Sequence, residues 1–391
     1  MSAKRPVRVL VVAGARPNFV KIAPLMDCLA SDAFTAQVET LLVHTGQHYD
    51  DALSKLFFDQ LKIPRPQMNL EVGSSSHGQQ TGEIMIRFEP VVRDWNPDVV
   101  VVVGDVNSTV ACALVATKLW VAVAHVEAGL RSFDRTMPEE INRVMTDSIS
   151  DFLFVTEPAG LINLRREGVP DQKIHLVGNV MIDSLQKFLP LARQTSALRD
   201  FGLLESDTTG SVARPRPYAL LTLHRPSNVD EKGKLASLLE TLNDIGTTIP
   251  VLFPAHPRTR ERLERFGLLD RVHTRWTTAA GGVLLTGPLG YLEFLYLMSE
   301  ATFVLTDSGG IQEETTALGV PCLTLRDNTE RPITVEEGTN TLVGDDAQRI
   351  LTAARQILAG SGKKGRVPAL WDGKAADRIV SVLVRSLERS I

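Results

Sequence analysis

The chain has 391 residues, of which 43% are hydrophobic and 23% are charged, and this suffices for two domains with large apolar cores. Its formal net charge of -4 excludes the strongly basic surface that nucleic-acid binding needs. No apolar run approaches the ~20 residues of a membrane span, so we expect no membrane partner.

The cysteines and the N-terminal segment indicate the compartment. Cys28, Cys112 and Cys322 lie far apart in apolar segments without the spacing of a metal site, which predicts reduced core thiols in a cytoplasmic protein that binds no metal. A short apolar run follows the basic N-terminus, but Gly14 to Asn18 ends it after about seven residues, and a signal peptide needs a longer one.

Short runs of valine, leucine and isoleucine alternate with segments of helical periodicity, which is typical of parallel βαβ units with helices on both faces of the sheet. In the first half we predict strands at Val7–Ala13, Val38–His44, Asp98–Val103, Val121–His125, Phe152–Val155 and Ile174–Val177. In the second half we predict them at Tyr218–Leu223, Pro250–Phe253, Val283–Thr286, Phe303–Thr306 and Pro321–Leu325. The pattern predicts an α/β protein of two doubly wound domains that meet near Gly178-Asn179, followed by an amphipathic helix over Ala375–Ser390.

Polar residues follow several of these strands. Ligands of open α/β sheets bind beyond the carboxyl ends of the strands, so two facing sheets would place these residues around one central cleft. After the first strand, Arg16 and Lys21 lie at the start of a helix and favour an anionic group, although Arg16 alone can equally be a surface charge. Neither a dinucleotide nor a Walker glycine motif is present, which weakens NAD-type and ATP-type interpretations.

Three carboxylates are candidate proton-handling groups. Asp105 follows a predicted strand but can also be a helix cap, and Glu127 follows another, where burial would raise its pKa. Glu139 has a structural alternative as well, because Thr136 and Glu139 have the spacing of a capping box. His224 also follows a predicted strand, where a lone histidine is more often structural than catalytic.

The segment from Phe303 to Asn340 predicts a nucleotide-sugar site. Ser308, Gly309 and Gly310 open a helix whose free N–H groups can hold a phosphate. Glu313 and Glu314 on its first turns are compatible with ordinary helix capping. The later arginines, Arg326 and Arg331, precede a second helix that Pro332 is well placed to begin.

The sequence resembles the non-hydrolysing UDP-N-acetylglucosamine 2-epimerases over nearly its whole length. The motifs that carry this resemblance are GARPNFVKIAPL (14–25), HTGQHYD (44–50), GDVNSTVACALVA (104–116), HVEAGLRSFDRTMPEEINR (125–143), VGNVMIDSL (177–185), LTLHRPSNVD (221–230), TDSGGIQEETTALGVPCL (306–323) and TERP (329–332). The resemblance implies two Rossmann-like domains of the glycosyltransferase-B type, residues 1–178 and 179–374, with the helix at 375–391 crossing back to the first. It also implies a cytosolic homodimer that holds UDP mainly in the second domain and needs no metal or nicotinamide.

The resemblance also implies roles for single residues. Arg16 and Lys21 match the family's basic residues near the phosphates and sugar, Asp105, Glu127 and Glu139 its three essential acids, and His224 its active-site histidine. Its nucleotide and ribose contacts are matched by Phe294, Ser308, Gly309, Gly310, Glu314 and Arg331. The implied chemistry is an anti elimination of UDP to a glucal, followed by re-addition with the configuration at C2 inverted.

The sequence departs from this pattern at three places. Leu289 stands where other members have a glutamine near the uracil, and Tyr49-Asp50 and Pro226-Ser227 differ from members that a second substrate molecule activates. The Tyr-Asp and Ser-Phe-Asp features also resemble the branch that acts on UDP-diacetamido-glucuronate sugars. A glycosyltransferase of the same fold and an inactive nucleotide-sugar sensor are the remaining alternatives; the first needs fewer acids, and the second would be expected to lack one.

Overall fold

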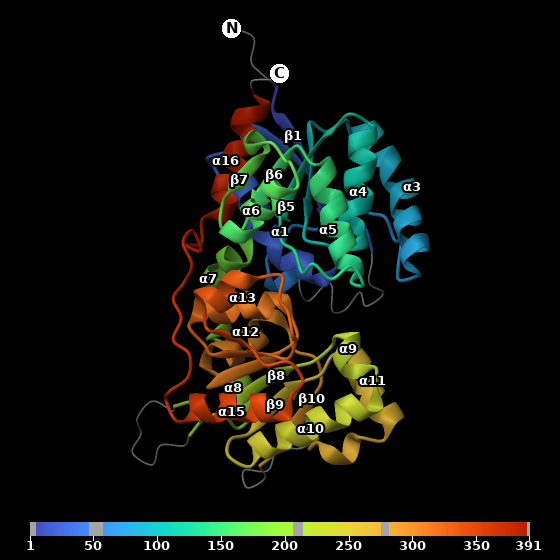
Figure 1. Cartoon of the computed structure of the whole chain (residues 1–391). Coiled ribbons are helices and arrows are strands. Elements are labelled where there is room, and N and C mark those ends of the chain that lie inside the picture. The colour runs from blue at the N-terminus through green and yellow to red at the C-terminus, as the bar shows by residue number, and fades with distance from the viewer. Residues whose placement is uncertain (1–4, 47–57, 206–213, 275–280, 389–391) are drawn as a thin grey trace. The chain divides into compact units, whose positions relative to one another are not determined.

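A computed structural model describes residues 5–46, 58–205, 214–274 and 281–388, apart from the side chain of Arg16 (Figure 1). Its contacts divide the chain into unit 1, residues 1–187 and 369–391, and unit 2, residues 188–368. The sequence placed the boundary before helix α7 (Val180–Ala192), whereas this division falls inside it. The first turns of α7 are held in unit 1, because Ser184 Oγ donates to the carbonyl of Val20 at 2.5 Å and Asp183 accepts the backbone N–H of Ala376 at 2.8 Å.

Unit 1 contains a parallel sheet whose seven described strands lie in the order β3-β2-β1-β4-β5-β6-β7. The strands are β1 (Val7–Ala13), β2 (Val38–His44), β3 (Met68–Asn69), β4 (Val99–Val103), β5 (Ala122–Ala128), β6 (Phe152–Val155) and β7 (Ile174–Leu176). The first half of the sequence predicted all of them except the two-residue β3. The winding direction reverses between β1 and β4, which is where such sheets bind ligands.

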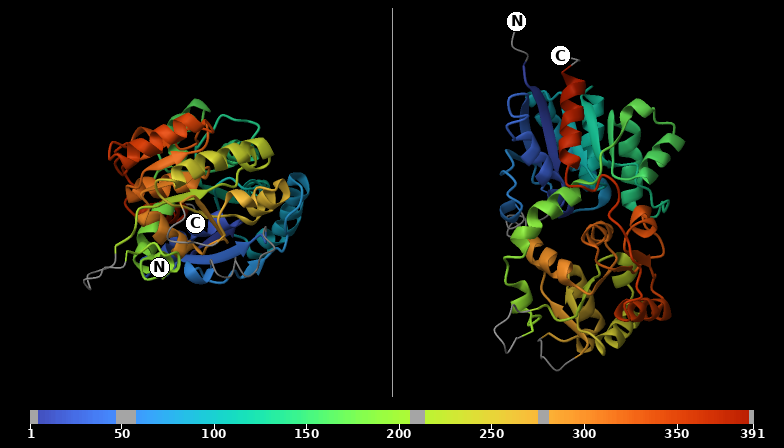
Figure 2. Two further views of the ribbon diagram at one scale, coloured as in Figure 1. Left: turned by 90° about the horizontal axis from the view of Figure 1, so that it is seen from below. Right: turned by 90° about the vertical axis from the view of Figure 1, so that its left-hand side faces the viewer.

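Helices lie against both faces of this sheet. They are α1 (Arg16–Leu29), α3 (His77–Trp95), α4 (Asn107–Lys118), α5 (Pro138–Ile149), α6 (Pro158–Arg166), the start of α7 and α16 (Ala375–Leu387), with a 3₁₀ turn at Asp171–Lys173. Figure 1 shows α3, α4 and α5 side by side, with α16 on the opposite side, and in the right-hand view of Figure 2 the red α16 lies along the sheet. α16 packs on α1, so the last helix belongs to unit 1.

Unit 2 repeats this topology with a parallel sheet of six described strands in the order β10-β9-β8-β11-β12-β13. The strands are β8 (Ala219–Thr222), β9 (Val251–Pro254), β10 (Val283–Thr286), β11 (Phe303–Thr306), β12 (Cys322–Thr324) and β13 (Asn340–Leu342). Its helices are α8 (Ala197–Asp200), α9 (Pro226–Val229), α10 (Lys232–Gly246), α11 (Pro257–Phe266), α12 (Tyr291–Glu300), α13 (Gly309–Leu318), α14 (Pro332–Glu336) and α15 (Ala347–Leu358), with a 3₁₀ turn at Leu269–Arg271. The reversal lies between β8 and β11, so the predicted α/β class with two doubly wound sheets is confirmed.

Candidate active site

Glu127 is positioned by a β-bulge near the end of β5. The pairing register between β5 and β6 shifts between Val126 and Ala128, and Glu127 has a φ of 73°. Non-glycine residues rarely adopt this left-handed conformation, which costs about 1 kcal/mol or more. The bulge brings the buried Glu127 carboxylate into an ion pair with the buried Lys21 ammonium of α1. The predicted phosphate ligand Lys21 therefore has a carboxylate as its immediate partner.

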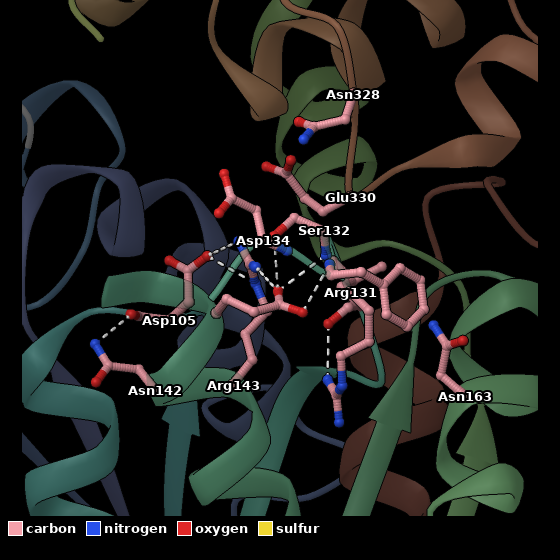
Figure 3. Close-up of polar contacts among 12 residues, drawn as sticks. Asp105, Arg131, Ser132, Asp134, Asn142, Arg143, Asn163, Asn328 and Glu330 are labelled. Carbon is pink, nitrogen blue, oxygen red and sulfur yellow. Dashed lines mark hydrogen bonds and ion pairs between the residues drawn. The ribbon is translucent and has the colours of Figure 1, made fainter. Parts of the chain in front are cut away.

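The neighbouring strand β4 ends in a tight turn that carries Asp105. Gly104 has a φ of 67°, and a Cβ there would lie 2.9 Å from Lys21 Nζ and 3.5 Å from Glu127 Oε2. A side chain at position 104 would therefore displace the ion pair. Asp105 accepts two hydrogen bonds through Oδ2, from Arg143 Nη2 at 2.7 Å and Nε at 3.1 Å, while its carbonyl accepts the amide of Asn142 at 2.9 Å (Figure 3).

The start of helix α5 shows whether Glu139 is a capping-box residue. Its N-cap is Met137 without a side-chain hydrogen bond, so the Thr136–Glu139 capping box is not formed. Glu140 occupies the third helical position instead, where its carboxylate accepts the backbone N–H groups of Ser132 and Phe133 at 2.9 Å each. Glu139 is half-buried, and its side chain has no hydrogen-bond or ion-pair partner among the residues that the structure describes.

The buried and exposed faces of α5 are chemically inverted. Its buried residues are all polar: Glu140, Asn142, Arg143, Thr146 and Asp147. Three of its apolar residues, Ile141, Val144 and Met145, are 43%, 42% and 45% exposed, while Ile149 at its end packs partly buried against the core. The sequence analysis did not identify this inversion, although the polar residues recur at the three- and four-residue spacing of one helical face. The polar face of α5 is what holds the loops that follow β4 and β5.

In unit 2, helix α13 begins as the sequence predicted, directly after β11. Ser308 is its N-cap and makes no side-chain capping bond, so the N–H groups of the first turn point outward from the helix start. A Cβ on Gly309 would lie 2.6 Å from Glu330 Oε1 and 2.7 Å from Arg331 Nη1. Glycine at this position therefore lets two charged side chains approach the start of the helix. Such a helix start favours a bound anion.

An ion cluster centred on Glu330 lies beside this helix start. Glu330 pairs with Arg331 Nη1 at 2.7 Å and Arg326 Nη2 at 2.9 Å, and Arg225 Nη2 lies 3.8 Å away. Arg331 Nε also pairs with the buried Glu313 at 2.9 Å. The cluster brings three guanidinium groups beside the helix start, and guanidinium groups can bind the oxygens of a diphosphate in a bidentate way.

His224 follows β8 and contacts Asp307, a buried residue that the sequence analysis did not select. His224 Nδ1 lies 3.0 Å from Asp307 Oδ1, and Asp307 Oδ2 accepts the backbone N–H groups of His224 at 3.0 Å and Arg225 at 2.9 Å. Burial opposes ionisation of Asp307, but the contact with His224 and these N–H groups lower its pKa below the ordinary value. The available signal was its position directly after a buried strand.

The two remaining predicted nucleotide contacts lie on neighbouring helices. Glu314 on α13 is buried and accepts the Tyr291 hydroxyl at 3.2 Å. Burial raises the pKa of Glu314 to about 8, a rise that the nearby charge of Glu313 supports and the Tyr291 hydrogen bond opposes. Phe294 lies half-buried on α12.

The structure thus groups the predicted residues in two places. Lys21, Glu127 and Asp105 meet at the Gly104 turn of unit 1, and Glu139 lies on the helix that holds Asp105. The unit 2 group consists of His224, Ser308, Gly309, Gly310, Glu314 and Arg331 with Phe294 on α12. Arg16 begins α1, but its side chain lies outside the described part of the chain, as do Tyr49 and Asp50. The described residues include no helix that could span a membrane and no group of metal-ligating side chains.

Comparison with known proteins gives consistent matches over nearly the whole chain. Residues 32–384 match the family model described as UDP-N-acetylglucosamine 2-epimerase. The UDP-N-acetylglucosamine 2-epimerase of Methanocaldococcus jannaschii is 43% identical over 96% of this chain and 99% of its own length. The UDP-2,3-diacetamido-2,3-dideoxy-D-glucuronate 2-epimerase of Pseudomonas aeruginosa is 40% identical over 97% of this chain and 100% of its own. The crystal structure of the M. jannaschii enzyme in complex with UDP-GlcNAc and UDP superposes with a TM-score of 0.84, at 42% identity over 97% of this chain and 100% of that one.

Proposed function

Because the chain belongs to the UDP-N-acetylglucosamine 2-epimerase family, we propose that it interconverts UDP-N-acetylglucosamine and UDP-N-acetylmannosamine by inverting the configuration at C2. The observation that carries this proposal is that one unit contains proton-handling groups and the other contains phosphate-binding groups. Unit 1 contains the carboxylates Asp105, Glu127 and Glu139, which can handle a proton. Unit 2 offers a helix start beside an arginine cluster, which can hold UDP.

The proposed reaction has two halves. A carboxylate removes the C2 proton, the C1–C2 double bond forms, and the bond from C1 to the diphosphate oxygen breaks with its electrons left on UDP. A diphosphate oxygen then attacks C1 again while an acid delivers a proton to the opposite face of C2. General acid–base catalysis contributes about 10²–10⁴-fold to such steps, and cations stabilise the departing diphosphate.

We assign the unit 1 residues to the proton and the unit 2 residues to the nucleotide. Lys21 acts through Glu127, because their ion pair fixes the position of the carboxylate. Ser308, Gly309, Gly310 and Arg331 bind the diphosphate, and His224 is fixed by Asp307. Glu314 and Phe294 contact the ribose and base, and Arg16 contributes a further charge toward the phosphates.

One observation favours a second UDP-sugar as the substrate. The P. aeruginosa relative, which carries the name of a UDP-diacetamido-glucuronate 2-epimerase, is 40% identical over essentially its whole length. The same elimination chemistry serves both sugars, since both have a proton at C2 and UDP at C1. We therefore propose UDP-N-acetylglucosamine first and UDP-2,3-diacetamido-2,3-dideoxyglucuronate as the alternative substrate.

The experiment is incubation with each UDP-sugar in deuterated water, followed by NMR. We expect UDP-N-acetylmannosamine to appear from UDP-N-acetylglucosamine with one solvent deuterium at C2. Epimer that retains ordinary hydrogen at C2 would indicate hydride transfer and contradict the elimination. Turnover of only the diacetamido sugar would shift the substrate but keep the mechanism.

We also propose that the enzyme is a cytoplasmic homodimer. The apolar residues Ile141, Val144 and Met145 recur at three- and four-residue spacing on the exposed face of α5, which suits a face covered by a second copy of the chain. Light scattering of the purified protein should give twice the chain mass, and a monomeric mass would contradict the dimer.

A further inference from the structure

His125 lies two residues before Glu127 on β5 and is fully buried, with both ring nitrogens engaged. Its Nδ1 lies 2.6 Å from Asp147 Oδ1 on α5, and its Nε2 lies 2.8 Å from the carbonyl oxygen of Gly104. On a regular strand, residues two apart point the same way. The bulge at Glu127 instead sends His125 to α5 and Glu127 to α1.

Both partners of His125 are hydrogen-bond acceptors. A carbonyl oxygen cannot donate, so Nε2 must carry a hydrogen. Burial opposes ionisation of Asp147, but the charge and hydrogen bond of His125 and the charge of Arg131 lower its pKa, so its carboxylate accepts as well. Asp147 also pairs with Arg131 at 2.7 Å, and Arg131 in turn pairs with Glu167 at 2.7 Å, so the His125–Asp147 contact belongs to a buried ion-pair network.

The partners of His125 lead to two of the three candidate acids of unit 1, Asp105 and Glu127. The Gly104 carbonyl belongs to the peptide that joins Gly104 to Asp105, so the Nε2 bond fixes the turn on which Asp105 stands. The other oxygen of Asp147 accepts the backbone N–H of Gly129 at 3.0 Å and pairs with Arg131 at 2.7 Å, just beyond the bulge. His125 thus contacts the backbone at Gly104, next to Asp105, and Asp147 contacts the backbone at Gly129, two residues after Glu127.

We propose that His125 and Asp147 form a positioning pair that sets the backbone of Asp105 against that of Glu127 for the C2 proton transfers. This inference rests on the proposed function, which makes these carboxylates proton-handling groups. Glu127 has a left-handed backbone conformation at a φ of 73°, which the surrounding contacts must maintain, whereas Gly104 adopts its φ of 67° without strain. A displacement of about 1 Å in reacting groups can lower turnover 10²-fold.

Two substitutions separate the two bonds of His125. In His125→Gln, the amide nitrogen can take the place of Nε2 and keep the bond to Gly104, while the contact with Asp147 is lost. In His125→Asn, the shorter amide can take the place of Nδ1 and keep the contact with Asp147, while the Gly104 bond is lost. Because the Gly104 bond reaches Asp105, we expect His125→Asn to lower kcat roughly 10²-fold and His125→Gln to stay within about tenfold of the wild type.

KM and the affinity for UDP should stay unchanged in both variants, because all proposed nucleotide ligands except Arg16 lie in unit 2. The matched control is His175→Gln, a half-buried histidine on β7 of the same sheet whose Nε2 has no hydrogen-bond partner among the described residues. The control should keep wild-type turnover. If His125→Gln and His125→Asn lower kcat equally, or if kcat falls only in proportion to the fraction of unfolded protein, the positioning role is overturned.

A measurement on the unaltered protein keeps the inference testable if the variants do not fold. In ¹⁵N-histidine-labelled protein, the Nε2 nitrogen of His125 should show the shift of an N–H group that donates to the Gly104 carbonyl, and an Nε2 without hydrogen would overturn the pair. This readout does not need turnover. If the wild type epimerises neither UDP-sugar, the proposed function fails, while the ring measurement still decides the hydrogen bonding of His125.

Discussion

The candidate regions of unit 1 and unit 2 occupy the same topological place in similar sheets but are built from different side chains. In unit 1 the winding reverses between β1 and β4, and in unit 2 between β8 and β11. The unit 1 region presents the carboxylates Asp105 and Glu127, paired with Arg143 and Lys21, whereas the unit 2 region presents a cluster of guanidinium groups around Glu330. One topology therefore supports two tasks, and the side chains after the strands decide which.

The backbone differs as well. Unit 1 places its acids with a bulge and a left-handed residue, which holds a charged side chain in one direction. Unit 2 uses an unstrained helix start and a glycine that leaves room for Glu330 and Arg331. We infer that the proton-handling residues of unit 1 need more exact placement than the nucleotide-binding residues of unit 2. The predictions below test this contrast, from the largest expected effect to the smallest.

The largest effect is expected at Glu127. In Glu127→Gln the buried Lys21 ammonium loses its counter-charge, and breaking a buried ion pair costs about 3–5 kcal/mol. Turnover should also fall by 10²-fold or more, because a proton-handling group is lost. Thermal unfolding and NMR turnover assays measure the two effects. Combining Glu127→Gln with Lys21→Met should restore much of the stability without restoring turnover, and full activity in the double variant would remove Glu127 from the mechanism.

Glu139 should separate catalysis from stability. Because its carboxylate has no described partner, Glu139→Gln should change the free energy of unfolding by less than ~1 kcal/mol while turnover falls by 10²-fold or more. Glu83→Gln on α3 is the matched control, since its surface pair with Arg87 contributes little. A stable Glu139→Gln enzyme with near-normal turnover would leave the mechanism with two acids.

Arg331 tests the nucleotide side. Arg331→Ala removes a guanidinium beside the α13 start, and UDP binding measured by calorimetry should weaken by roughly 1.5–3 kcal/mol. The stability of the variant should fall too, because Glu313 and Glu330 lose a partner. The UDP titration is therefore made at a temperature below the unfolding transition of the variant. Arg366→Ala, at an exposed arginine of the same unit, should leave UDP affinity intact. Unchanged affinity in Arg331→Ala would count against the assignment.

The smallest expected effect is a pH dependence from Glu314. Its folded pKa of about 8 lies above the ordinary value of 4.5, so the folded protein keeps a proton that the unfolded chain releases. Its stabilising contribution is therefore complete below the unfolded pKa and is lost as pH rises through about 8. Between pH 6.5 and 8.5 the free energy of unfolding of the wild type should fall by about 1–2 kcal/mol more than that of Glu314→Gln. Denaturant unfolding measures this difference. Parallel pH profiles would show that Glu314 titrates normally.

The sequence by itself determined the class, the winding and most strands, because buried parallel strands are continuous apolar runs that need no partner to be seen. Strands β1, β2, β6, β10 and β11 begin and end where the sequence predicted. β3 and β13 were missed because they are very short and carry polar residues. Motif position also selected residues that the fold gathers in each unit, since strand ends converge at the reversal of winding.

Only the tertiary structure decided how those residues are held. The spacing of Thr136 and Glu139 fits a capping box, but the helix begins one residue later, because Glu140 is drawn to the N–H groups of Ser132 and Phe133. The bulge at Glu127 and the bridge from His125 to Gly104 depend on β4, β6 and α5 together. Such features follow from pairing register and from buried charges that must find partners across the fold, and neither is written in the local order of residues.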